Sequence, residues 1–389
     1  MRQPAKILLV AGEASGDKHA ARLIRALRDQ LPEVALTGIG GAALAAQGMQ
    51  FICRAEDLAV IGLTEVVHKL PLIWRALGRI WQHLTHDRPD LVILVDFPDF
   101  NFLVLRLARR CRVPVMYYIS PQVWAWRRGR VKTIARLVNR MVVIFPFEEE
   151  FYRRHGVAVT YVGHPLLETL PDLPPRSELR QRFGLEQRDL AIALLPGSRT
   201  GEIKQLLPAM LASAGQLHAA LPSSRFFLPL APTINPDFVQ PLLAQATVPV
   251  ALLQHQTYDV LSAADLALVA SGTATLETAL MGTPMVILYR LAPLTYYVGR
   301  LLIRVPHIGM ANLLAQEALF PELIQDEVTP AKITAAALHL IKDTGQLARI
   351  RAGLLQLRQG LGGPGASSRA AAVALELLAR PGAQPGPDL

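Results

Sequence analysis

Short apolar runs alternate with longer segments of helical periodicity along most of this chain of 389 residues. Several of the runs are hydrophobic throughout, as expected of strands that helices cover on both faces. This alternation is typical of an α/β fold built on parallel sheets. In the first half of the chain the expected strands are Ile7–Val10, Leu36–Ile39, Leu91–Val95, Val113–Ile119, Met141–Phe145 and Val159–Val162.

A proline-rich segment, LPDLPP from Leu170 to Pro175, interrupts this series. A second series follows it, with strands expected at Ala191–Leu195, Arg225–Leu230, Val250–Leu253, Leu266–Ala270 and Met285–Tyr289. We therefore predict an α/β protein with two Rossmann-like, doubly wound domains facing a cleft. The predicted domains are residues 1–170 and 171–345, closing C-terminal helices cover 346–380, and residues 381–389 form a disordered tail.

Hydrophobic residues make up 51% of the chain, which raises the question of a membrane span. The longest uncharged stretch, Phe238–Tyr258, is broken by Pro241 and Pro249, whereas a spanning helix needs roughly 20 mostly apolar residues. The N-terminus also lacks the long apolar core of a signal peptide. We therefore expect a protein that stays in the cytosol.

The formal net charge of +9 favours an anionic partner. Nucleic acid, an acidic membrane surface and a phosphorylated substrate are the alternatives, and charge alone does not choose among them. The two cysteines, Cys53 and Cys111, form no motif with metal-ligand spacing. They are expected to be buried thiols in a reducing compartment, and no metal site is predicted.

The first strand runs into a glycine-rich loop, AGEASGD, which spans Ala11–Asp17 and precedes a helix expected from about Lys18. Ser15 and Asp17 are either site residues or simple caps of that helix. A carboxylate at Glu13 gains little from the loop itself, so Glu13 is the stronger functional candidate. The spacing is not that of a dinucleotide-binding fingerprint.

The third strand of the first half ends in VDFPDFN, which contains Asp96, Asp99 and Asn101. Carboxylates at the end of a strand can supply a general base for a hydroxyl nucleophile if burial raises the pKa of one of them. An Asx turn or a helix cap is the alternative for Asp99. A metal site is less favoured, because the turn at Pro98 separates the two carboxylates.

The next strand ends at Ser120 and continues as SPQVWAWRRGRVK, where Trp124 and Trp126 precede a cluster of basic residues. The basic residues are Arg127, Arg128, Arg130 and Lys132. Aromatic and basic residues in this order suit stacking with nucleic acid bases, an anionic bilayer surface, or a core position with a solvated helix face. The apolar segment Val60–Leu84, with basic residues spaced through it, has the composition of an interfacial helix and favours the bilayer.

In the second half, a strand runs into PGSRTGEIKQ, so Gly197 and Ser198 precede a helix expected to begin near Gly201. Free backbone N–H groups at a helix start bind anions, and Arg199 adds a side chain suited to two-point contact with phosphate. The spacing lacks the lysine of a Walker A loop, so ATP hydrolysis is not implied.

A similar junction occurs in VASGTATLE, where Ser271 and Gly272 lead to Thr273, the expected N-cap, and Glu277 lies one turn into the helix. A loop of glycine and hydroxyl residues with an acidic residue nearby suits a diphosphate and a ribose diol. The alternative for Glu277 is a surface charge favoured by the helix dipole. Together the two loops predict a nucleotide-diphosphate site in the second domain.

Ordered motifs along the chain resemble those of the lipid-A-disaccharide synthase family. They are AGEASGD, GIGG, LAVIGLTEV, VDFPDFN, SPQVWAWR, FPFE, VGHPL, LPGSRTGEI, ASGTATLE, PMVILYR and NLLAQE, and they span Ile7 to about Thr329. The family is similar to other GT-B glycosyltransferases. The resemblance implies transfer of 2,3-diacylglucosamine from UDP-diacylglucosamine to the 6-hydroxyl of lipid X, with anomeric inversion and without a metal or other cofactor.

The resemblance also implies roles for individual residues. On the acceptor side these are Glu13, Ser15, Asp96 and Asp99, with one aspartate as the base; on the UDP side they are Arg199, Ser271, Gly272, Thr273, Glu277 and Asn312. Asn101, Ser120, Gly197 and Ser198 complete the set of expected substrate-binding residues. The chain departs from the usual family pattern at Phe97, Gln122, Glu168 and Ala311, which puts acyl-chain selectivity in doubt more than the reaction.

The family further implies a homodimer with exchanged C-terminal segments, and peripheral attachment to the inner face of the plasma membrane. Nucleic acid is not an expected partner, because it would leave the phosphate loops unexplained. Two alternatives remain: another GT-B enzyme, such as a peptidoglycan N-acetylglucosaminyltransferase or a UDP-sugar epimerase, and a catalytically silent nucleotide-sugar-binding protein. Intact Glu13, Asp96 and Asp99 argue against the silent protein.

Overall fold

The computed structural model describes residues 4–58, 63–124, 129–291, 307–315 and 317–379. The chain divides into two compact units: Met1–Thr169 together with Leu361–Leu389, and Leu170–Gly360. The first boundary between the units follows Thr169 and lies beside the proline-rich segment Leu170–Pro175. The closing helices expected over 346–380 do not form one group, because α16 (Thr344–Gly360) belongs to the second unit and α17 (Ala366–Ala379) to the first. The tail expected over 381–389 lies outside the described residues.

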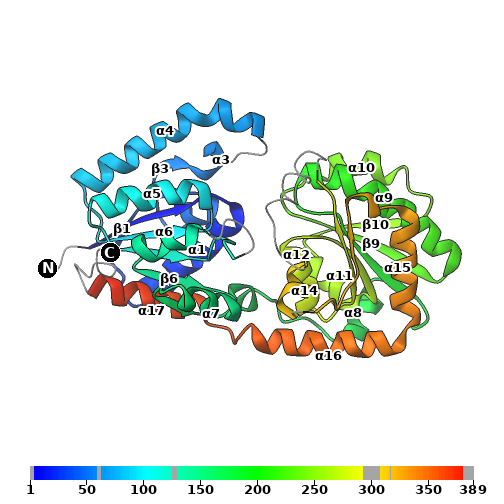
Figure 1. Ribbon diagram of the computed structural model, residues 1–389. Coiled ribbons are helices and arrows are strands. Elements are labelled where there is room, and N and C mark those ends of the chain that lie inside the picture. Colours follow the sequence, from blue (N-terminus) through cyan, green and yellow to red (C-terminus); the bar gives the residue numbers. More distant parts are fainter. Residues whose placement is uncertain (1–3, 59–62, 125–128, 292–306, 316, 380–389) are drawn as a thin grey trace. The chain divides into compact units, whose positions relative to one another are not determined.

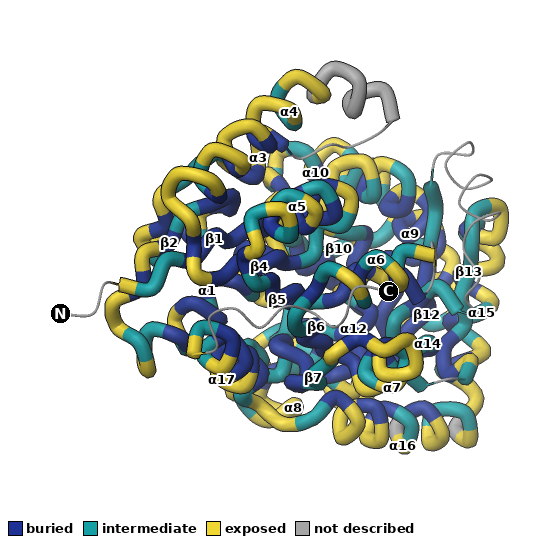
Figure 2. Tube along the Cα trace, turned by 60° about the vertical axis from the view of Figure 1, so that its left-hand side comes forward, coloured by how far each residue is buried: buried dark blue, intermediate teal, exposed yellow. Residues whose placement is uncertain are grey.

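The first unit is built on one parallel sheet with helices on both faces (Figure 1). Its elements are β1 (Ala5–Ala11), α1 (Ala14–Arg28), β2 (Val34–Gly40), α2 (Ala42–Ala45), β3 (Gln50–Arg54), α3 (Ala55–Leu58), α4 (Leu63–His86), β4 (Leu91–Val95), α5 (Pro98–Arg110), β5 (Val115–Tyr118), α6 (Arg130–Leu137), β6 (Arg140–Val143), α7 (Pro146–Arg154), β7 (Val159–Tyr161), the 3₁₀ turn η1 (Pro165–Glu168) and α17. The central strands are fully buried, because every residue of β4 and β5 is enclosed by helices (Figure 2).

The second unit repeats this architecture. Its elements are α8 (Arg176–Arg182), β8 (Leu190–Leu195), α9 (Thr200–Ala220), β9 (Ser224–Leu230), α10 (Pro236–Leu243), β10 (Val250–Gln254), α11 (Thr257–Ala263), β11 (Leu266–Ala270), α12 (Thr273–Leu280), β12 (Met285–Tyr289), α14 (Met310–Ala315), β13 (Glu322–Ile324), the 3₁₀ turn η2 (Gln325–Glu327), α15 (Pro330–Lys342) and α16. The predicted class, with two parallel doubly wound sheets, is confirmed.

Strand order locates the place where ligands bind in such sheets. The first sheet runs β3-β2-β1-β4-β5-β6-β7, and the second runs β10-β9-β8-β11-β12-β13. In each sheet the direction of winding reverses between two neighbouring strands, β1 and β4 in the first and β8 and β11 in the second. Ligands of doubly wound folds bind beyond the carboxyl ends of the strands at this switch point.

Two edge strands were not predicted from the sequence. In β3 all five residues are at least partly exposed, so the segment lacks the continuous apolar run that marks a central strand. Strand β13 has only three residues, which is too short for a periodicity to appear. Both pair in parallel with the strand beside them, β3 with β2 and β13 with β12.

The final helix, α17, belongs to the first unit, although it follows the whole second unit in the sequence. It packs on α1 and the strands β4, β5 and β6. Glu168 accepts hydrogen bonds from the backbone N–H and the hydroxyl of Ser367, at 2.7 and 2.6 Å, at the start of the helix. The guanidinium of Arg369 donates to the carbonyl of Val162 at 2.8 Å. The exchange of C-terminal segments implied by the family stays a prediction, since here α17 packs on its own chain.

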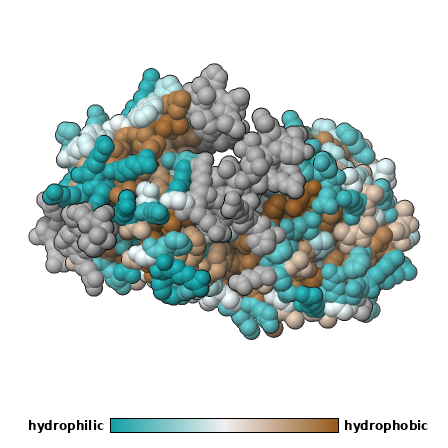
Figure 3. Space-filling model, viewed as in Figure 1, coloured by the Kyte–Doolittle hydropathy of each residue, from teal (hydrophilic) through white to brown (hydrophobic). Residues whose placement is uncertain are grey.

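Helix α4 covers the first sheet with one side only. Ala76, Ile80 and Leu84 are buried against the core. On its other side Trp74 is 68% exposed and Leu70 is 42% exposed. Apolar surface is visible along this helix in Figure 3. Among the helices of the described residues, none is long and apolar enough to cross a bilayer.

Candidate active site

The loop after β1 and the loop after β4 meet at the switch point of the first sheet. After β4 the backbone turns sharply, with φ of 45° at Asp96 and 48° at Phe97. Positive φ is unfavourable for residues with a Cβ, and two in succession are found where the surrounding structure holds them. The Phe97 ring lies over Gly12, where any Cβ would clash with it. Gly12 therefore allows the two loops to approach each other.

This turn leaves the Asp96 carboxyl partly enclosed. Burial and, to a smaller extent, the negative charge of Glu13 raise the pKa of Asp96 to about 7, while a hydrogen bond with the backbone N–H of Phe97 opposes the rise. A carboxyl group with a pKa near neutrality can accept a proton from a hydroxyl at physiological pH. The fold thus brings together Asp96 and Glu13, two of the residues expected on the acceptor side.

Asp99 lies in a different environment. It occupies the first turn of α5, its side chain is 66% exposed, and its carboxylate is 2.5 Å from the guanidinium of Arg130. The two aspartates of the VDFPDFN motif therefore do not form a close carboxylate pair engaged with one ligand. Asp96 has a partly buried carboxyl group, whereas Asp99 forms an exposed ion pair.

The helix after β1 begins earlier than the sequence predicted. Helix α1 starts at Ala14 with Glu13 at the N-cap, and no side chain caps it. Ser15 is exposed in its first turn. Asp17 is buried and accepts hydrogen bonds from the backbone N–H groups of Gly41 and Ala43, at 2.7 and 2.8 Å. Asp17 therefore caps the short helix α2, rather than its own helix.

Asn101 and Ser120, both predicted to bind substrate, are enclosed in the first unit. The amide nitrogen of Asn101 is 2.5 Å from the carbonyl oxygen of Asp96. The hydroxyl of Ser120 is 2.6 Å from that of Tyr152, in a buried contact. Because both side chains bond within the fold, we assign them to supporting the site's loops.

The structure contradicts the predicted membrane-facing position of Trp124. Its side chain is only 9% exposed, so it does not lie on a membrane-facing surface. Its indole N–H donates to Glu148 Oε1 at 3.1 Å, and its ring packs edge-on against Phe147. Burial raises the pKa of Glu148 to about 7, although the Trp124 indole lowers it. Of the other predicted interfacial residues, Trp126, Arg127 and Arg128 lie outside the described residues.

In the second unit, the loop after β8 holds the predicted phosphate residues. The backbone N–H groups of Ser198 and Arg199 both donate to Glu202 Oε2, at 2.9 and 3.3 Å. Gly197 has a φ of 116° and leaves the space that the Glu202 side chain fills. These two amides are therefore occupied within the chain, contrary to the predicted open anion site. The Arg199 side chain is 64% exposed, and its guanidinium forms an ion pair with Glu202 Oε1 at 3.5 Å.

The loop after β11 lies at the switch point of the second sheet. Gly272 holds the N-cap position of α12, and the expected cap, Thr273, is the first helical residue and is exposed. The hydroxyl of Ser271 donates to the carbonyl of Ile308 at 3.3 Å. Glu277 lies further along α12, partly buried.

Asn312 is completely buried and does not present its side chain to a ligand. Its amide nitrogen donates to Glu322 Oε1, and its amide oxygen accepts from the backbone of Phe320, at 2.8 and 2.9 Å. The same Glu322 carboxylate accepts from the backbone N–H groups of Ile308 and Gly309. Asn312 therefore helps hold the segment that contacts Ser271.

Several residues of the two sites were missed by the sequence analysis. They are Tyr117, Glu148, Glu202, Tyr258 and Glu322. Glu202 had a usable signal, because it stands at the capping-box spacing from Arg199. No feature of the sequence identified Tyr117, since an aromatic residue within an apolar strand cannot be distinguished from an ordinary core residue.

The sequence of this chain matches a known protein family over most of its length. The sequence profile of lipid-A-disaccharide synthetase matches residues 7–377. The chain belongs to this family. A lipid-A-disaccharide synthase of Geobacter sulfurreducens is 46% identical over 375 residues, covering 96% of this chain and 98% of that one. The synthase of Myxococcus xanthus is 44% identical over 378 residues, covering 97% and 99%.

Solved structures share the fold at low sequence identity. The calicheamicin glycosyltransferase CalG4 has a TM-score of 0.61 at 16% identity, covering 98% of this chain and 99% of its own. A UDP complex of Staphylococcus aureus MnaA has a TM-score of 0.64 at 13% identity, covering 97% and 98%. Such similarity establishes the two-sheet fold and does not separate transferases from epimerases, because a UDP-N-acetylglucosamine 2-epimerase also matches.

Family membership decides between these alternatives. The chain is a glycosyltransferase of lipid A disaccharide synthesis, which confirms the predicted enzyme class and reaction.

Proposed function

We propose that this chain transfers 2,3-diacylglucosamine from UDP to the 6-hydroxyl of lipid X and releases UDP. The observation that carries the proposal is the family match over residues 7–377. The two switch-point sites support it, because the reaction needs a nucleotide site and an acceptor site with a base.

The nucleotide diphosphate binds, in this proposal, at the strand ends of the second unit. Arg199 presents an exposed guanidinium at the start of α9, suited to two-point contact with a phosphate. Glu277 has a carboxylate that can accept hydrogen bonds from a ribose diol. Negative charge develops on the UDP oxygens as the glycosidic bond breaks, and a fixed guanidinium stabilises this charge. Ser271 and Thr273 complete the expected contacts.

Asp96 is the proposed general base on the acceptor side. Its carboxyl is partly buried, its pKa is about 7, and it follows a strand at the switch point. A sugar hydroxyl is a poor nucleophile until a base removes its proton. We assign Asp99 to acceptor binding, since its carboxylate already pairs with Arg130 and lies in solvent. Glu13 tunes the base through its negative charge, and Ser15 contacts the acceptor.

Helix α4 is the proposed membrane contact, which fits an acceptor anchored in a bilayer by its acyl chains. Exposed Trp74 and Leu70 supply apolar area on the outer side of the helix. The net charge of +9 favours an anionic surface. We further propose that the enzyme acts at the inner face of the plasma membrane as a homodimer.

The proposal is tested by incubating the full-length chain with UDP-diacylglucosamine and lipid X. The expected product, identified by mass spectrometry, is the tetraacylated disaccharide 1-phosphate, formed in equal amount with UDP. Release of UDP without disaccharide, or epimerisation of a UDP-sugar at C2, would overturn it. Omission of lipid X is the control and should abolish disaccharide formation.

A further inference from the structure

The turn that presents Asp96 is unfavourable in isolation. Asp96 and Phe97 both have left-handed backbone angles, at φ of 45° and 48°, although neither is glycine. A chain free to relax would leave this conformation, and the direction of the Asp96 carboxyl would change with it. Something in the fold must therefore hold the turn in place.

Two buried donors converge on one atom of the turn. The hydroxyl of Tyr117 donates to the carbonyl oxygen of Asp96 at 2.8 Å, and the amide nitrogen of Asn101 donates to the same oxygen at 2.5 Å. Tyr117 comes from β5 and Asn101 from α5, and both side chains have zero exposure. A carbonyl oxygen has two lone pairs, so this oxygen is fully satisfied by the pair.

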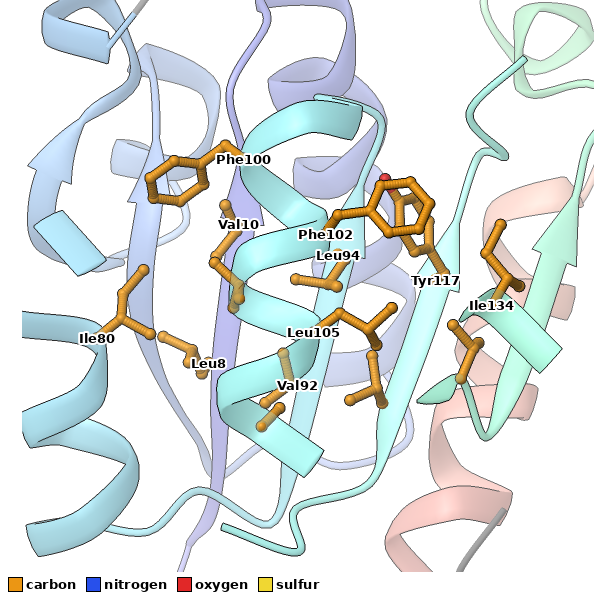
Figure 4. Close-up of a cluster of buried hydrophobic side chains, with 14 of the residues drawn as sticks. Leu8, Val10, Ile80, Val92, Leu94, Phe100, Phe102, Leu105, Tyr117 and Ile134 are labelled. Atoms are coloured by element: carbon orange, nitrogen blue, oxygen red, sulfur yellow. The ribbon is translucent and has the colours of Figure 1, made fainter. Parts of the chain in front are cut away.

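Tyr117 lies in the hydrophobic core between β5 and α5. Figure 4 shows its ring beside Phe102, with the hydroxyl directed toward the end of the sheet where α5 begins. A phenylalanine would fill the same space without a polar group to bury. The hydroxyl is therefore explained by the bond to Asp96, because an unpaired buried hydroxyl is costly. Burial raises the pKa of Tyr117 well above its usual value, so the phenol remains a donor throughout the physiological range.

We propose that Tyr117 is a positioning residue for the transfer reaction, which acts by holding the Asp96–Phe97 turn through the Asp96 carbonyl. Asn101 is its partner in this clamp. The inference rests on the proposed function, because it requires Asp96 to be the base. Tyr117 touches neither substrate in this proposal, and it affects the rate through the direction and burial of the Asp96 carboxyl.

Tyr117→Phe tests the proposal, since it removes one oxygen and keeps the ring. Tyr118→Phe is the matched control: it is the next residue of β5, so it faces the opposite side of the sheet, near Glu168 and Ser367. We expect Tyr117→Phe to lower kcat about tenfold, the size of effect that the loss of one hydrogen bond supporting the base can produce. The KM for UDP-diacylglucosamine should not change, and Tyr118→Phe should keep the wild-type kcat.

A pH profile separates positioning from a general loss of stability. If the turn relaxes, the Asp96 carboxyl becomes more hydrated and its pKa falls, so the acid limb of kcat moves to lower pH in Tyr117→Phe. In an Asp96→Asn background, Tyr117→Phe should cause no further loss of the residual rate, because the two residues act through one group. Asn101→Ala provides a second variant and should shift the acid limb in the same direction.

The outcomes distinguish this inference from the function on which it rests. Wild-type activity that survives Asp96→Asn would remove Asp96 as the base and contradict the proposed mechanism. An inactive Asp96→Asn together with wild-type kcat and pH profile in Tyr117→Phe would overturn only the positioning role. A tenfold loss that persists undiminished in the Asp96→Asn background would also overturn it.

Discussion

The hydroxyl of Tyr258, on α11, donates a hydrogen bond to Glu277 Oε1, on α12, at 2.8 Å. Both side chains are partly buried in the second unit. A carboxylate oriented in this way has one direction fixed by the protein and still has lone pairs for a ligand. Glu277 is thus pre-oriented before any nucleotide arrives, which lowers the entropic cost of binding.

Tyr258→Phe should therefore weaken UDP binding by roughly 0.5–1.5 kcal/mol, and Glu277→Ala by roughly 1.5–3 kcal/mol. Titration calorimetry of the full chain measures both. With 2′,3′-dideoxy-UDP the effects of the two substitutions should largely disappear, because the diol that Glu277 binds is missing. An equal loss for UDP and the dideoxy analogue would instead place Glu277 away from the ribose.

Replacing the two aspartates of VDFPDFN should have unequal effects. Asp96→Asn removes a base and should lower kcat by about 10²–10⁴-fold, while Asp99→Asn should lower it far less. UDP affinity should survive in both variants, as calorimetry will show. Near-equal losses in kcat would mean that the exposed ion pair with Arg130 also takes part in proton transfer.

The pH dependence of kcat follows from the raised pKa of Asp96. The base works when deprotonated, so the rate should rise with pH through about 7 and then level off. Since the charge of Glu13 raises this pKa, Glu13→Gln should move the rise to lower pH. A shift to higher pH in that variant would contradict the assignment.

Glu148 predicts a pH effect on stability. Burial raises its pKa in the folded state to about 7 from 4.5, so the stability it contributes is complete below about pH 4.5 and is lost as the pH rises through 7. The loss is up to about 3 kcal/mol. The stability of Glu148→Gln relative to wild type should therefore increase between pH 5 and pH 8 in urea unfolding. Glu149→Gln, at the partly exposed neighbouring position of α7, is the control for replacing a carboxylate with an amide.

Trp74→Ala should reduce binding to anionic vesicles, since it removes the most exposed indole of α4. Flotation with anionic and neutral vesicles measures the effect. Leu355→Ala is the control, because Leu355 is a 60% exposed apolar residue on α16, which belongs to the second unit. Equal recovery of wild type and Trp74→Ala would exclude α4 as the contact.

The central strands could be predicted from the sequence, because they are buried on both faces and are therefore continuously apolar. The loops at the switch points could also be predicted, since each of them begins where a predicted strand ends. The start of α1 was placed too late, because Gly16 reads as a loop residue. In the structure Gly16 lies within the helix beside Val95 of β4, where a Cβ would make only ordinary van der Waals contact.

The environment of each site residue could not be predicted in the same way. Asp96 and Asp99 differ in burial because the backbone at Asp96 turns with positive φ, and no residue type there signals it. The bond from Tyr117 to Asp96 joins positions 21 residues apart and depends on that turn. Asn312 looked like a ligand-binding amide, and only its burial shows that it bonds within the unit.

The return of the chain to the first unit has a consequence for biosynthesis. The second unit is an insertion of about 190 residues between η1 and α17. A ribosome adding 5–20 residues per second needs about 10–40 s to translate it, and during this time α1 lacks the helix that covers it. The nascent first unit therefore lacks α17 until synthesis ends. Until then the apolar face that α17 covers is exposed, and Glu168 has not yet met Ser367.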